Sequence, residues 1–478
     1  MLSESATPVG LLGDRAKSPL HEKLNGLSGR DSWHGSWTTR TNGGNGRKMD
    51  IKSLLHRIAT EDQGHYAERV FKRLPRNLDN QDEVQLETLL HLADCLLSRI
   101  DEMDELDTIE ELIESQPGKW PLAARMIVKL ARSKAVLDHR SGRIHFSVVV
   151  PLYGEHERLL RPFEHPAGED FIRQKLRQIE WACGEGSRHT FDILLVDDGC
   201  PNGSGRIAEK ILNRDHSQAA ARVLFLEEAI ERNHPAVEGV RSVRDSQKGG
   251  AVHLGLWEAS SNSNYSYREH IVAFTDADLS THLGQLGLLV EALDKPGTRV
   301  AAGSRRARNS VVVKQSNRSA RGRLFIYLWK KLLPELAYID DTQCGFKAMR
   351  AEHVAPLIAS PSNRGFAFDI ELLLMAELMK RRSVTEVPIA WIDSELASNT
   401  QSTSTHLSML RSIVSLSRSL ENRRASCEAF SEAIDGLSEE SWDQAVEQFG
   451  PTLDHIDTAL DRDSQLVAPR QLLALQAG

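Results

Sequence analysis

Short apolar runs that alternate with helical patterns constrain the fold of the middle of this chain more than any other feature. The runs span 146–151, 191–196, 221–226, 271–275 and 299–303 and are rich in β-branched residues. Strands buried on both faces of a parallel sheet have this composition. Helical patterns occupy 171–183, 205–213 and 283–293. We therefore expect an α/β fold, in which helices flank a mostly parallel, Rossmann-like sheet.

Polar motifs follow several of these runs directly. Right-handed crossovers bring the carboxyl ends of parallel strands to one edge of the sheet, where ligands of open α/β sheets bind. That edge would carry Pro151-Leu152-Tyr153-Gly154-Glu155 after the first run, Asp197-Asp198-Gly199 after the second and Asp276-Ala277-Asp278 after the fourth. The sequence therefore predicts a carboxylate-rich ligand site at this edge.

The pair Asp276 and Asp278 predicts a divalent-cation site. Two carboxylates one residue apart at a strand end can reach the same ion if the chain bends there. Mg²⁺ and Mn²⁺ favour a few carboxylates together with substrate phosphate oxygens. The alternative interpretation is an Asp-rich turn that holds no ligand.

The other motifs suggest contacts to a nucleotide. Asp198 could accept hydrogen bonds from a base or a ribose, and Gly199 allows a sharp turn with positive φ. Tyr153 could stack on a nucleobase, and Glu155 could hold a ribose or a neighbouring arginine. Lys248 supplies a point charge for a phosphate. The two glycines that follow it would let the backbone approach that phosphate closely. A solvated turn is the alternative interpretation of the Asp-Asp-Gly motif.

In this order, the four motifs resemble glycosyltransferase family 2, whose fold is of the GT-A type. The family pattern is strand-Pro-x-Tyr-Asn-Glu, then Val-Asp-Asp-Gly-Ser, then Lys-Gly, then Asp-x-Asp. This chain has Gly154 where asparagine is usual and Cys200 where serine is usual. The carboxylates and the tyrosine of the pattern remain, so the resemblance survives both changes.

A later block narrows the resemblance. Residues 340–347 read Asp-Asp-Thr-Gln-Cys-Gly-Phe-Lys. This block is similar to one in dolichyl-phosphate and polyprenyl-phosphate glucosyltransferases. Residues 366–373 resemble their Phe-Asp-x-Glu-Leu segment, and residues 303–305 resemble their Gly-Ser-Arg. The resemblance covers residues 146–394, about half of the chain.

The resemblance implies an inverting transferase that moves a sugar, with glucose favoured, from a donor such as UDP-glucose to a polyprenyl phosphate. The implied nucleotide-sugar-binding residues are Pro151, Tyr153, Glu155, Asp197, Asp198, Lys248, Asp276 and Arg305. The implied metal ligands for Mg²⁺ or Mn²⁺ are Asp276 and Asp278, and the implied catalytic residues are Asp278, Asp341 and Asp369.

The role of Asp369 stays open at this point. A hydroxyl acceptor needs a base that takes its proton, whereas a phosphate acceptor is already anionic. Asp369 could be that base, could position the acceptor, or could cap the helix that the apolar residues after it predict. The nearby Cys344 is more typical of a small buried packing residue than of a nucleophile.

The stretch 304–323 carries seven arginines and lysines and no acidic residue. Like charges keep such a stretch mobile unless an anion neutralises them. We favour a lid that closes on a diphosphate or a lipid phosphate, because arginine forks suit phosphate oxygens. The alternative is a solvated basic loop.

The whole chain divides into four predicted parts. These are a disordered tail over 1–48, a helical segment over 49–140, a catalytic domain over 144–398 and a helical extension over 399–478. The tail is too polar to bury enough surface to offset its chain entropy. In the extension, residues 407–420 form a basic amphipathic pattern that could lie on an anionic membrane or pack against the catalytic domain.

Composition excludes several classes of protein. A net charge of -8 and a pI of about 6.2 argue against a nucleic-acid binder. Five scattered cysteines without CxxC spacing suggest neither a disulfide framework nor a zinc site. No apolar run approaches the roughly 18 residues that cross a bilayer, and the N-terminus lacks a secretory signal pattern. We therefore expect a cytoplasmic protein whose membrane contact, if any, is peripheral.

Two other functions stay open. The chain could be a family 2 transferase that acts on a soluble or protein acceptor, which the missing membrane-spanning segments favour. A nucleotidyltransferase or a non-catalytic nucleotide-sugar binder is less favoured. A nucleotidyltransferase would carry a glycine-rich phosphate loop after its first strand, where this chain has residues 151–155.

Overall fold

The computed structural model describes residues 78, 82–100, 102–115, 120–184, 189–261, 268–313, 319–359, 363–393, 403–421, 424–454 and 466–476. The predicted tail and the first part of the predicted N-terminal helical segment lie outside these residues. The chain divides into two compact units, 1–56 and 57–478, and every described residue belongs to the second unit.

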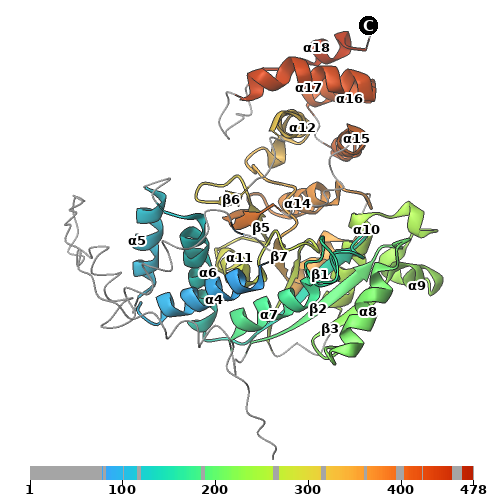
Figure 1. Ribbon diagram of the computed structural model, residues 1–478. Helices are drawn as coiled ribbons and strands as arrows, with labels where there is room; N and C mark the ends of the chain where they lie inside the picture. Colours follow the sequence, from blue (N-terminus) through green and yellow to red (C-terminus); the bar gives the residue numbers. More distant parts are fainter. Residues whose placement is uncertain are drawn as a thin grey trace, which may run out of the picture. The chain divides into compact units, whose positions relative to one another are not determined.

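A seven-stranded sheet forms the centre of the second unit (Figure 1). Its strands are β1 (Ile144–Leu152), β2 (Thr190–Asp197), β3 (Ala221–Phe225), β4 (Glu269–Phe274), β5 (Val300–Ser304), β7 (Lys347–Arg350) and β8 (Val384–Pro388). They lie in the order β3-β2-β1-β4-β7-β5-β8, and all neighbours are parallel except the two pairs that contain β7. The predicted fold class is confirmed, and the five predicted strands are β1 to β5.

Strand β7 was not predicted, and it determines the geometry of the site. It runs antiparallel between β4 and β5, so that Lys347 at its start pairs with Phe274 at the end of β4. The Asp-Thr-Gln-Cys-Gly segment that precedes β7 therefore lies at the carboxyl edge of the parallel strands. This reversal brings Gly345 beside Asp276.

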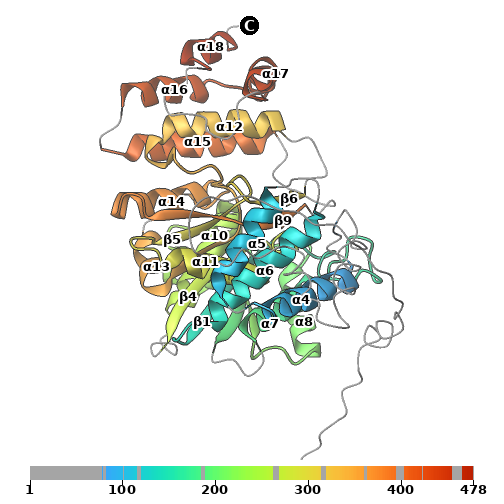
Figure 2. The same cartoon turned by 90° about the vertical axis from the view of Figure 1, so that its left-hand side faces the viewer.

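Helices cover both faces of the sheet (Figures 1 and 2). One face packs on α7 (Phe171–Cys183), α8 (Ser204–Arg214) and α11 (Leu286–Leu293), and the other packs on α10 (Lys248–Ser260), α13 (Ala351–Leu357) and α14 (Phe368–Met379). Alternate residues of each strand enter the two cores, as in Val149 and Val150 of β1. Both faces are buried, which explains why the strands read as continuous apolar runs.

Three helices within the predicted N-terminal segment lie beside the first of these faces (Figure 2). They are α4 (Glu83–Leu97), α5 (Met103–Glu114) and α6 (Leu122–Asp138). Helix α6 is amphipathic and packs against both α4 and α11. Arg132 on α6 pairs with Glu291 on α11 at 2.7 Å.

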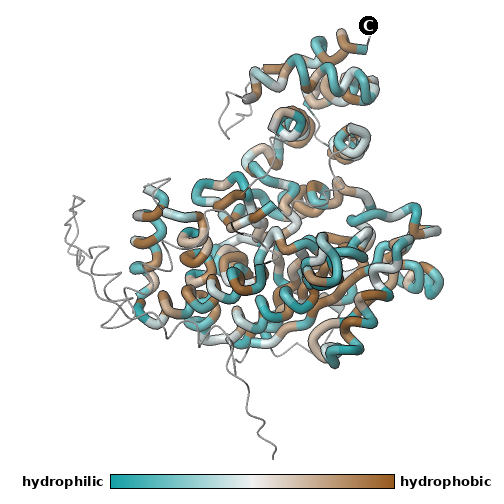
Figure 3. Tube along the Cα trace, in the orientation of Figure 1, coloured by the Kyte–Doolittle hydropathy of each residue, from teal (hydrophilic) through white to brown (hydrophobic). Residues whose placement is uncertain are grey.

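The C-terminal helices form a bundle with α12 on the α14 side of the sheet (Figure 2). The bundle contains α12 (Ser319–Leu332), α15 (Thr403–Ser419), α16 (Ala425–Asp435), α17 (Glu439–Asp454) and α18 (Pro469–Ala474). Hydrophobic and hydrophilic positions alternate along these helices in Figure 3, and the hydrophobic ones, including Trp329 and Trp442, are buried in a shared core.

This bundle corrects the membrane interpretation of residues 407–420. The apolar side chains of α15, among them Leu407, Leu410 and Ile413, are buried in the bundle core. Its basic residues are also engaged, since Arg411 donates to the carbonyl of Leu437 at 2.7 Å and Arg418 pairs with Asp435 at 2.6 Å. Protein therefore covers the face that would have met lipid, and the packing alternative holds.

The predicted basic lid is also partly wrong. Residues 319–323 belong to α12, where Arg321 pairs with Asp443 of α17 at 2.9 Å. Residues 314–318 lie outside the described residues. The first half contributes β6 (Val311–Val313), which pairs with β9 (Ala390–Ile392) in a small parallel sheet.

The remaining element among the described α-helices is the short α9 (Leu226–Glu231). Across the described ranges, every helix is too short or too polar to cross a lipid bilayer.

The contact between α6 and α11 can be tested at Gly287, because a Cβ there would lie 1.9 Å from the backbone oxygen of Ser133. Gly287→Ala should therefore lower the midpoint of thermal unfolding by several degrees, a loss of about 1–3 kcal/mol from overpacking.

Gly322→Ala is the matched control, since Gly322 also lies in a helix but a Cβ there meets nothing within 4 Å. Alanine should leave stability unchanged or raise it by about 0.4–1 kcal/mol. Equal melting temperatures for the two variants would contradict the close approach of α6 and α11.

Candidate functional site

The site lies where β1, β2 and β4 end side by side. Strand β1 pairs with β2 on one side and with β4 on the other, so Glu155, Asp198 and Asp276 follow three adjacent strands. Lys248 enters from the first residue of α10, and Gly345 enters from the segment before β7. Residues far apart in the sequence thus meet at one edge, as the strand pattern predicted.

Asp276 is the most constrained carboxylate at this edge. Its Oδ1 bonds the ammonium of Lys248, and its carboxyl group packs against Gly345, where a Cβ would lie 2.3 Å from Oδ2. Burial would raise its pKa, but Lys248 and Arg305 outweigh burial and hold the pKa below its ordinary value. The side chain is still 38% exposed, so Asp276 is an ionised carboxylate that remains open to a ligand.

Asp278 follows on a loop that a chain of ion pairs ties to β1. Its Oδ1 accepts a hydrogen bond from the backbone of Ser280 at 3.0 Å. Glu155 pairs with Arg158, which also lies 3.5 Å from Glu169, and Glu169 accepts from the backbone of Leu279 at 3.0 Å. Loop 153–169 therefore supports the loop that carries Asp278.

Glu155 is a mostly buried carboxyl group with a raised pKa. Burial raises its pKa to about 7, against the opposing charge of Arg158, and the negative charge of Asp278 raises it further. Of the two predicted contacts for Glu155, a ribose or an arginine, the structure contains the arginine.

Lys175 was missed by the sequence analysis. It lies on α7, it is 1% exposed, and its Nζ has no hydrogen-bond partner within the described residues. Burial lowers its pKa, which the charges of Asp278 and Asp276 oppose. The neighbouring His282 is neutral, because burial and Lys175 lower its pKa to about 3. Lys175 is thus a buried amine close enough to the two aspartates for their charges to act on it, although burial disfavours its charged form.

The adjacent aspartates of β2 have different environments. Asp197 accepts backbone hydrogen bonds from Gly199 and Cys200 at 3.0 Å each and from Gly205 at 2.6 Å. These bonds commit it to shaping the β2–α8 turn, so its predicted nucleotide contact is replaced by a structural role. The carboxyl group of Asp198 accepts a hydrogen bond from the hydroxyl of Ser246 at 2.9 Å, and burial raises its pKa to about 7. Asp198 is therefore the ligand candidate.

The two departures from the family pattern contact each other. The backbone N–H of Gly154 donates to Sγ of Cys200 at 3.2 Å, so the thiol takes the acceptor role that a serine hydroxyl would have. Gly154 and Gly199 both have positive φ, of 75° and 71°. Beside them Pro151 is buried in β1, whereas Tyr153 is 52% exposed and free to meet a flat ligand.

Arg305 and Asp341 form a bidentate ion pair, with Nε–Oδ2 and Nη2–Oδ1 distances of 2.7 and 2.8 Å. The backbone of Arg305 donates to the same carboxylate at 2.9 Å. Burial opposes ionisation of Asp341, but Arg305 holds its pKa well below the ordinary range. Such a carboxylate cannot take a proton from a substrate at neutral pH. We therefore revise its predicted catalytic role to that of positioning Arg305.

Asp369 is not a helix cap. The N-cap residue of α14 is Ala367, and Asp369 lies in the first turn, where its carboxylate pairs with Lys347 at 2.5 Å. Lys347 also donates to the carbonyls of Thr342 and Cys344, at 3.0 and 2.6 Å. Burial raises the pKa of Asp369, against the two lysines beside it.

Cys344 fits the packing role expected of it. It is buried, and burial raises the pKa of its thiol to about 12. A thiol that stays protonated at neutral pH is a poor nucleophile.

The carboxylates at the edge suit a hard divalent cation. Within the described residues, no group of three or more His, Cys, Asp or Glu side chains converges on one point. Mg²⁺ commonly takes one or two protein carboxylates and completes its shell with water and substrate phosphates. Asp276 and Asp278 match that partial donor set, with Lys248 beside them for a phosphate oxygen.

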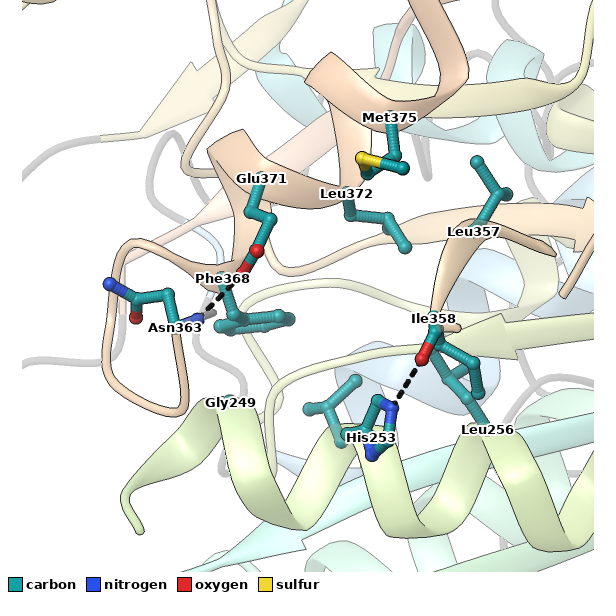
Figure 4. Close-up of a pocket in the computed structure, with 11 residues that line it drawn as sticks. Gly249, His253, Leu256, Leu357, Ile358, Asn363, Phe368, Glu371, Leu372 and Met375 are labelled. Carbon is teal, nitrogen blue, oxygen red and sulfur yellow. Dashed lines mark hydrogen bonds between the residues drawn. The ribbon is translucent and has the colours of Figure 1, made fainter. Parts of the chain in front are cut away.

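A small apolar pocket of about 30 Å³ lies between α10 and α14, close to Lys248 (Figure 4). His253 and Glu371 line it, but their polar atoms are bonded to the carbonyl of Ile358 and the N–H of Asn363. The pocket is therefore too small and too apolar for a nucleotide sugar.

Comparison with known proteins now decides the family. A family model described as glycosyl transferase family 2 matches residues 147–354, which contain β1, β2, β4 and the Asp276–Asp278 loop. The chain carries a glycosyltransferase family 2 domain. The protein is a glycosyltransferase, and this confirms the family and the enzyme class that the motifs predicted.

The curated relatives of this glycosyltransferase include dolichyl-phosphate beta-glucosyltransferases. The protein of that name from Mus musculus is 28% identical over 256 residues, which are 52% of this chain and 68% of that protein. The one from Saccharomyces cerevisiae is 26% identical over 262 residues, 52% of this chain and 67% of that protein.

Among solved structures, the chain is similar to mannosyl-3-phosphoglycerate synthase from Rubrobacter xylanophilus, with 17% identity over 62% of this chain and 80% of that one and a TM-score of 0.40. Glucosyl-3-phosphoglycerate synthase from Mycobacterium tuberculosis is 16% identical over 60% of this chain and 83% of that one, with a TM-score of 0.38.

The packing of Gly345 on Asp276 predicts that Gly345→Ala will impair sugar transfer. The added Cβ must displace the carboxylate, and a misplacement of about 1 Å can cost roughly 100-fold in rate. We expect kcat/KM to fall by about that factor while the melting temperature changes little. Gly142→Ala is the control, because a Cβ there meets nothing within 4 Å. Full activity of Gly345→Ala would contradict the constraint on Asp276.

The raised pKa of Asp198 predicts a pH-dependent stability. Between the unfolded value of about 3.9 and the folded value of about 7, the folded protein holds a proton that the unfolded chain has lost. This contribution to stability is present below pH 4 and is lost as the pH rises to 7. Asparagine does not titrate, so Asp198→Asn does not lose this stability as the pH rises. The melting temperature of Asp198→Asn relative to that of wild type should therefore rise from pH 4 to pH 7.

Asp104→Asn, at an exposed position of α5, should show no such trend. A constant difference in melting temperature between Asp198→Asn and wild type from pH 4 to pH 8 would rule out the buried, protonated carboxyl group.

Proposed function

We propose that this protein is an inverting hexosyltransferase that uses a nucleoside diphosphate sugar and a divalent cation. UDP-glucose is the favoured donor, because the curated relatives carry the name of a glucosyltransferase. The observation that carries the proposal is the ionised Asp276 carboxylate, which Lys248 and the backbone at Gly345 hold at the strand edge two residues before Asp278.

Asp276 and Asp278 would hold Mg²⁺ or Mn²⁺, which supplies positive charge for a departing diphosphate. Lys248 would hold a phosphate oxygen, since it lies at the N-terminus of α10 with its ammonium on Asp276. Asp198 and Tyr153 would hold the nucleoside, the first through a hydrogen bond and the second by stacking. Each of these contacts would position the donor.

The reaction is a single displacement at the anomeric carbon. An acceptor oxygen forms the new bond to that carbon as the bond to the β-phosphate oxygen breaks, and the bonding electrons leave with the nucleoside diphosphate. When the acceptor is a hydroxyl, its proton passes to a carboxylate base. Asp369 suits that role better than Asp341, because burial raises the pKa of Asp369 whereas Arg305 lowers that of Asp341.

Two acceptor classes are consistent with this site. The relatives named dolichyl-phosphate beta-glucosyltransferase support a polyprenyl phosphate. The burial of the apolar face of α15 supports a soluble acceptor instead, because that face was the strongest candidate for membrane contact. A cytoplasmic location is proposed with the soluble acceptor, and peripheral membrane contact is proposed with the lipid.

Asp278→Ala should abolish transfer without unfolding the protein. Loss of one electrostatic contact to the leaving group is worth at least about 100-fold in kcat. The assay is release of nucleoside diphosphate from a panel of nucleotide sugars with Mn²⁺ or Mg²⁺, and Asp104→Ala is the matched control.

Retained activity in Asp278→Ala would contradict the proposed metal site. Release of pyrophosphate in place of nucleoside diphosphate would identify a nucleotidyltransferase. Binding of UDP-glucose without turnover under any metal condition would identify a non-catalytic binder.

A further inference from the structure

A cavity of about 230 Å³ lies between the loop before α14 and the first turns of α15. It is far larger than the roughly 15 Å³ that admits one water molecule. The residues that line it are Gln247, Gly365, Phe366, Ala367, Ser404, Thr405, Ser408, Met409 and Ser412. Exposed Gln247, Ser404 and Ser408 leave it open to solvent.

The cavity adjoins the proposed transfer site along the backbone. Gln247 directly precedes Lys248, and Ala367 lies two residues before Asp369. The backbone N–H of Gln247 donates to the carbonyl of Arg364 at 3.0 Å, which holds the Lys248 loop against the loop that leads into α14. A molecule in the cavity would therefore contact the two chain segments that lead into Lys248 and Asp369.

The lining favours a neutral, hydroxyl-rich ligand. The exposed hydroxyl of Ser408 and the amide of Gln247 can donate and accept hydrogen bonds, and Phe366 offers an apolar ring. The hydroxyl of Ser412 donates to the carbonyl of Ser408 at 3.1 Å and keeps its capacity to accept. None of the residues that line the cavity carries a charge. A phosphate would favour arginine forks or lysines. The basic residues next to the lining in the sequence are already engaged. Lys248 pairs with Asp276, Arg364 donates to the carbonyl of Ala236 at 3.0 Å, and Arg411 donates to the carbonyl of Leu437 at 2.7 Å.

We propose that this cavity binds the acceptor, and that the acceptor is an uncharged carbohydrate or polyol that offers a hydroxyl to the donor sugar. The proposal rests on the proposed glycosyltransferase reaction and names its substrate class. The acceptor oxygen bonds the anomeric carbon, its proton passes to Asp369, and the nucleoside diphosphate leaves with the electron pair of the broken bond.

The wall of the cavity formed by α15 lies outside the part of the chain that matches the family model. The family model ends at residue 354, whereas the hydroxyl-bearing wall of the cavity begins at residue 404. The donor machinery therefore lies within the shared domain, and the wall that would recognise the acceptor comes from a helix outside it. This chain therefore has a candidate acceptor wall that the family model does not include.

Ser408→Trp tests the cavity. Ser408 is exposed, so tryptophan can enter the cavity without a cost to the core. Ser415→Trp is the matched control, because Ser415 is exposed on the same helix and does not line the cavity. Three readouts are needed. The first two are release of UDP from UDP-glucose without acceptor, and transfer to methyl β-glucoside, octyl β-glucoside or farnesyl phosphate. Binding of methyl glucoside, galactoside and mannoside in the presence of UDP is followed by ligand-observed NMR.

We expect a methyl or octyl glycoside to accept sugar, and Ser408→Trp to lower its kcat/KM roughly tenfold or more. Acceptor-independent UDP release should match wild type in both variants. Turnover of octyl but not methyl glycoside would identify a lipid-borne sugar of the same neutral chemistry.

Activity on farnesyl phosphate alone would overturn the inference, as would equal acceptor kinetics in the two variants. Lack of binding by every methyl glycoside would also overturn it. These outcomes are distinct from failure of the proposed function, in which wild type releases no UDP from UDP-glucose at all.

Discussion

The whole site depends on keeping the Asp276 carboxylate charged at the carboxyl edge of the sheet. Partial burial there would raise the pKa of an aspartate, because it disfavours the ionised form. Lys248 and Arg305 supply the compensating positive charge to Asp276. Gly345 then fixes where the carboxylate lies, since only a hydrogen side chain fits against it.

Two short loops and one antiparallel strand connect the carboxylates of the site to the rest of the fold. Strand β7 returns the Asp-Thr-Gln-Cys-Gly segment to the edge, and Lys347 at its start joins that segment to Asp369. On the other side, Arg158 connects Glu155 to Glu169 and so supports the loop of Asp278. The carboxylates are thus held by different strands yet form a single charge-balanced group.

Much of this could be predicted from the sequence, because it depends on local patterns. Continuous apolar runs predicted β1 to β5, and the acidic motifs after them predicted which residues would share an edge. Strand β7 was not predictable, since its four residues have no strand pattern and their pairing is set by β4 and β5. Lys175 was missed for a related reason: a lysine on an amphipathic helix usually faces water, and only the packing of α7 buries it. The roles of Asp197 and Asp341 could not be predicted for the same kind of reason. Asp197 accepts hydrogen bonds from backbone N–H groups, and Asp341 pairs with Arg305, which is distant in the sequence.

The central claim is that Asp276 and Asp278 present a cation to the diphosphate of the donor. A crystal structure with UDP and Mn²⁺, recorded at the manganese absorption edge, tests it directly. We predict one anomalous peak bonded both to an aspartate of this pair and to diphosphate oxygens, with Lys248 near a phosphate. UDP bound at the strand edge with no manganese on either aspartate, or manganese elsewhere on the molecule, would contradict the account.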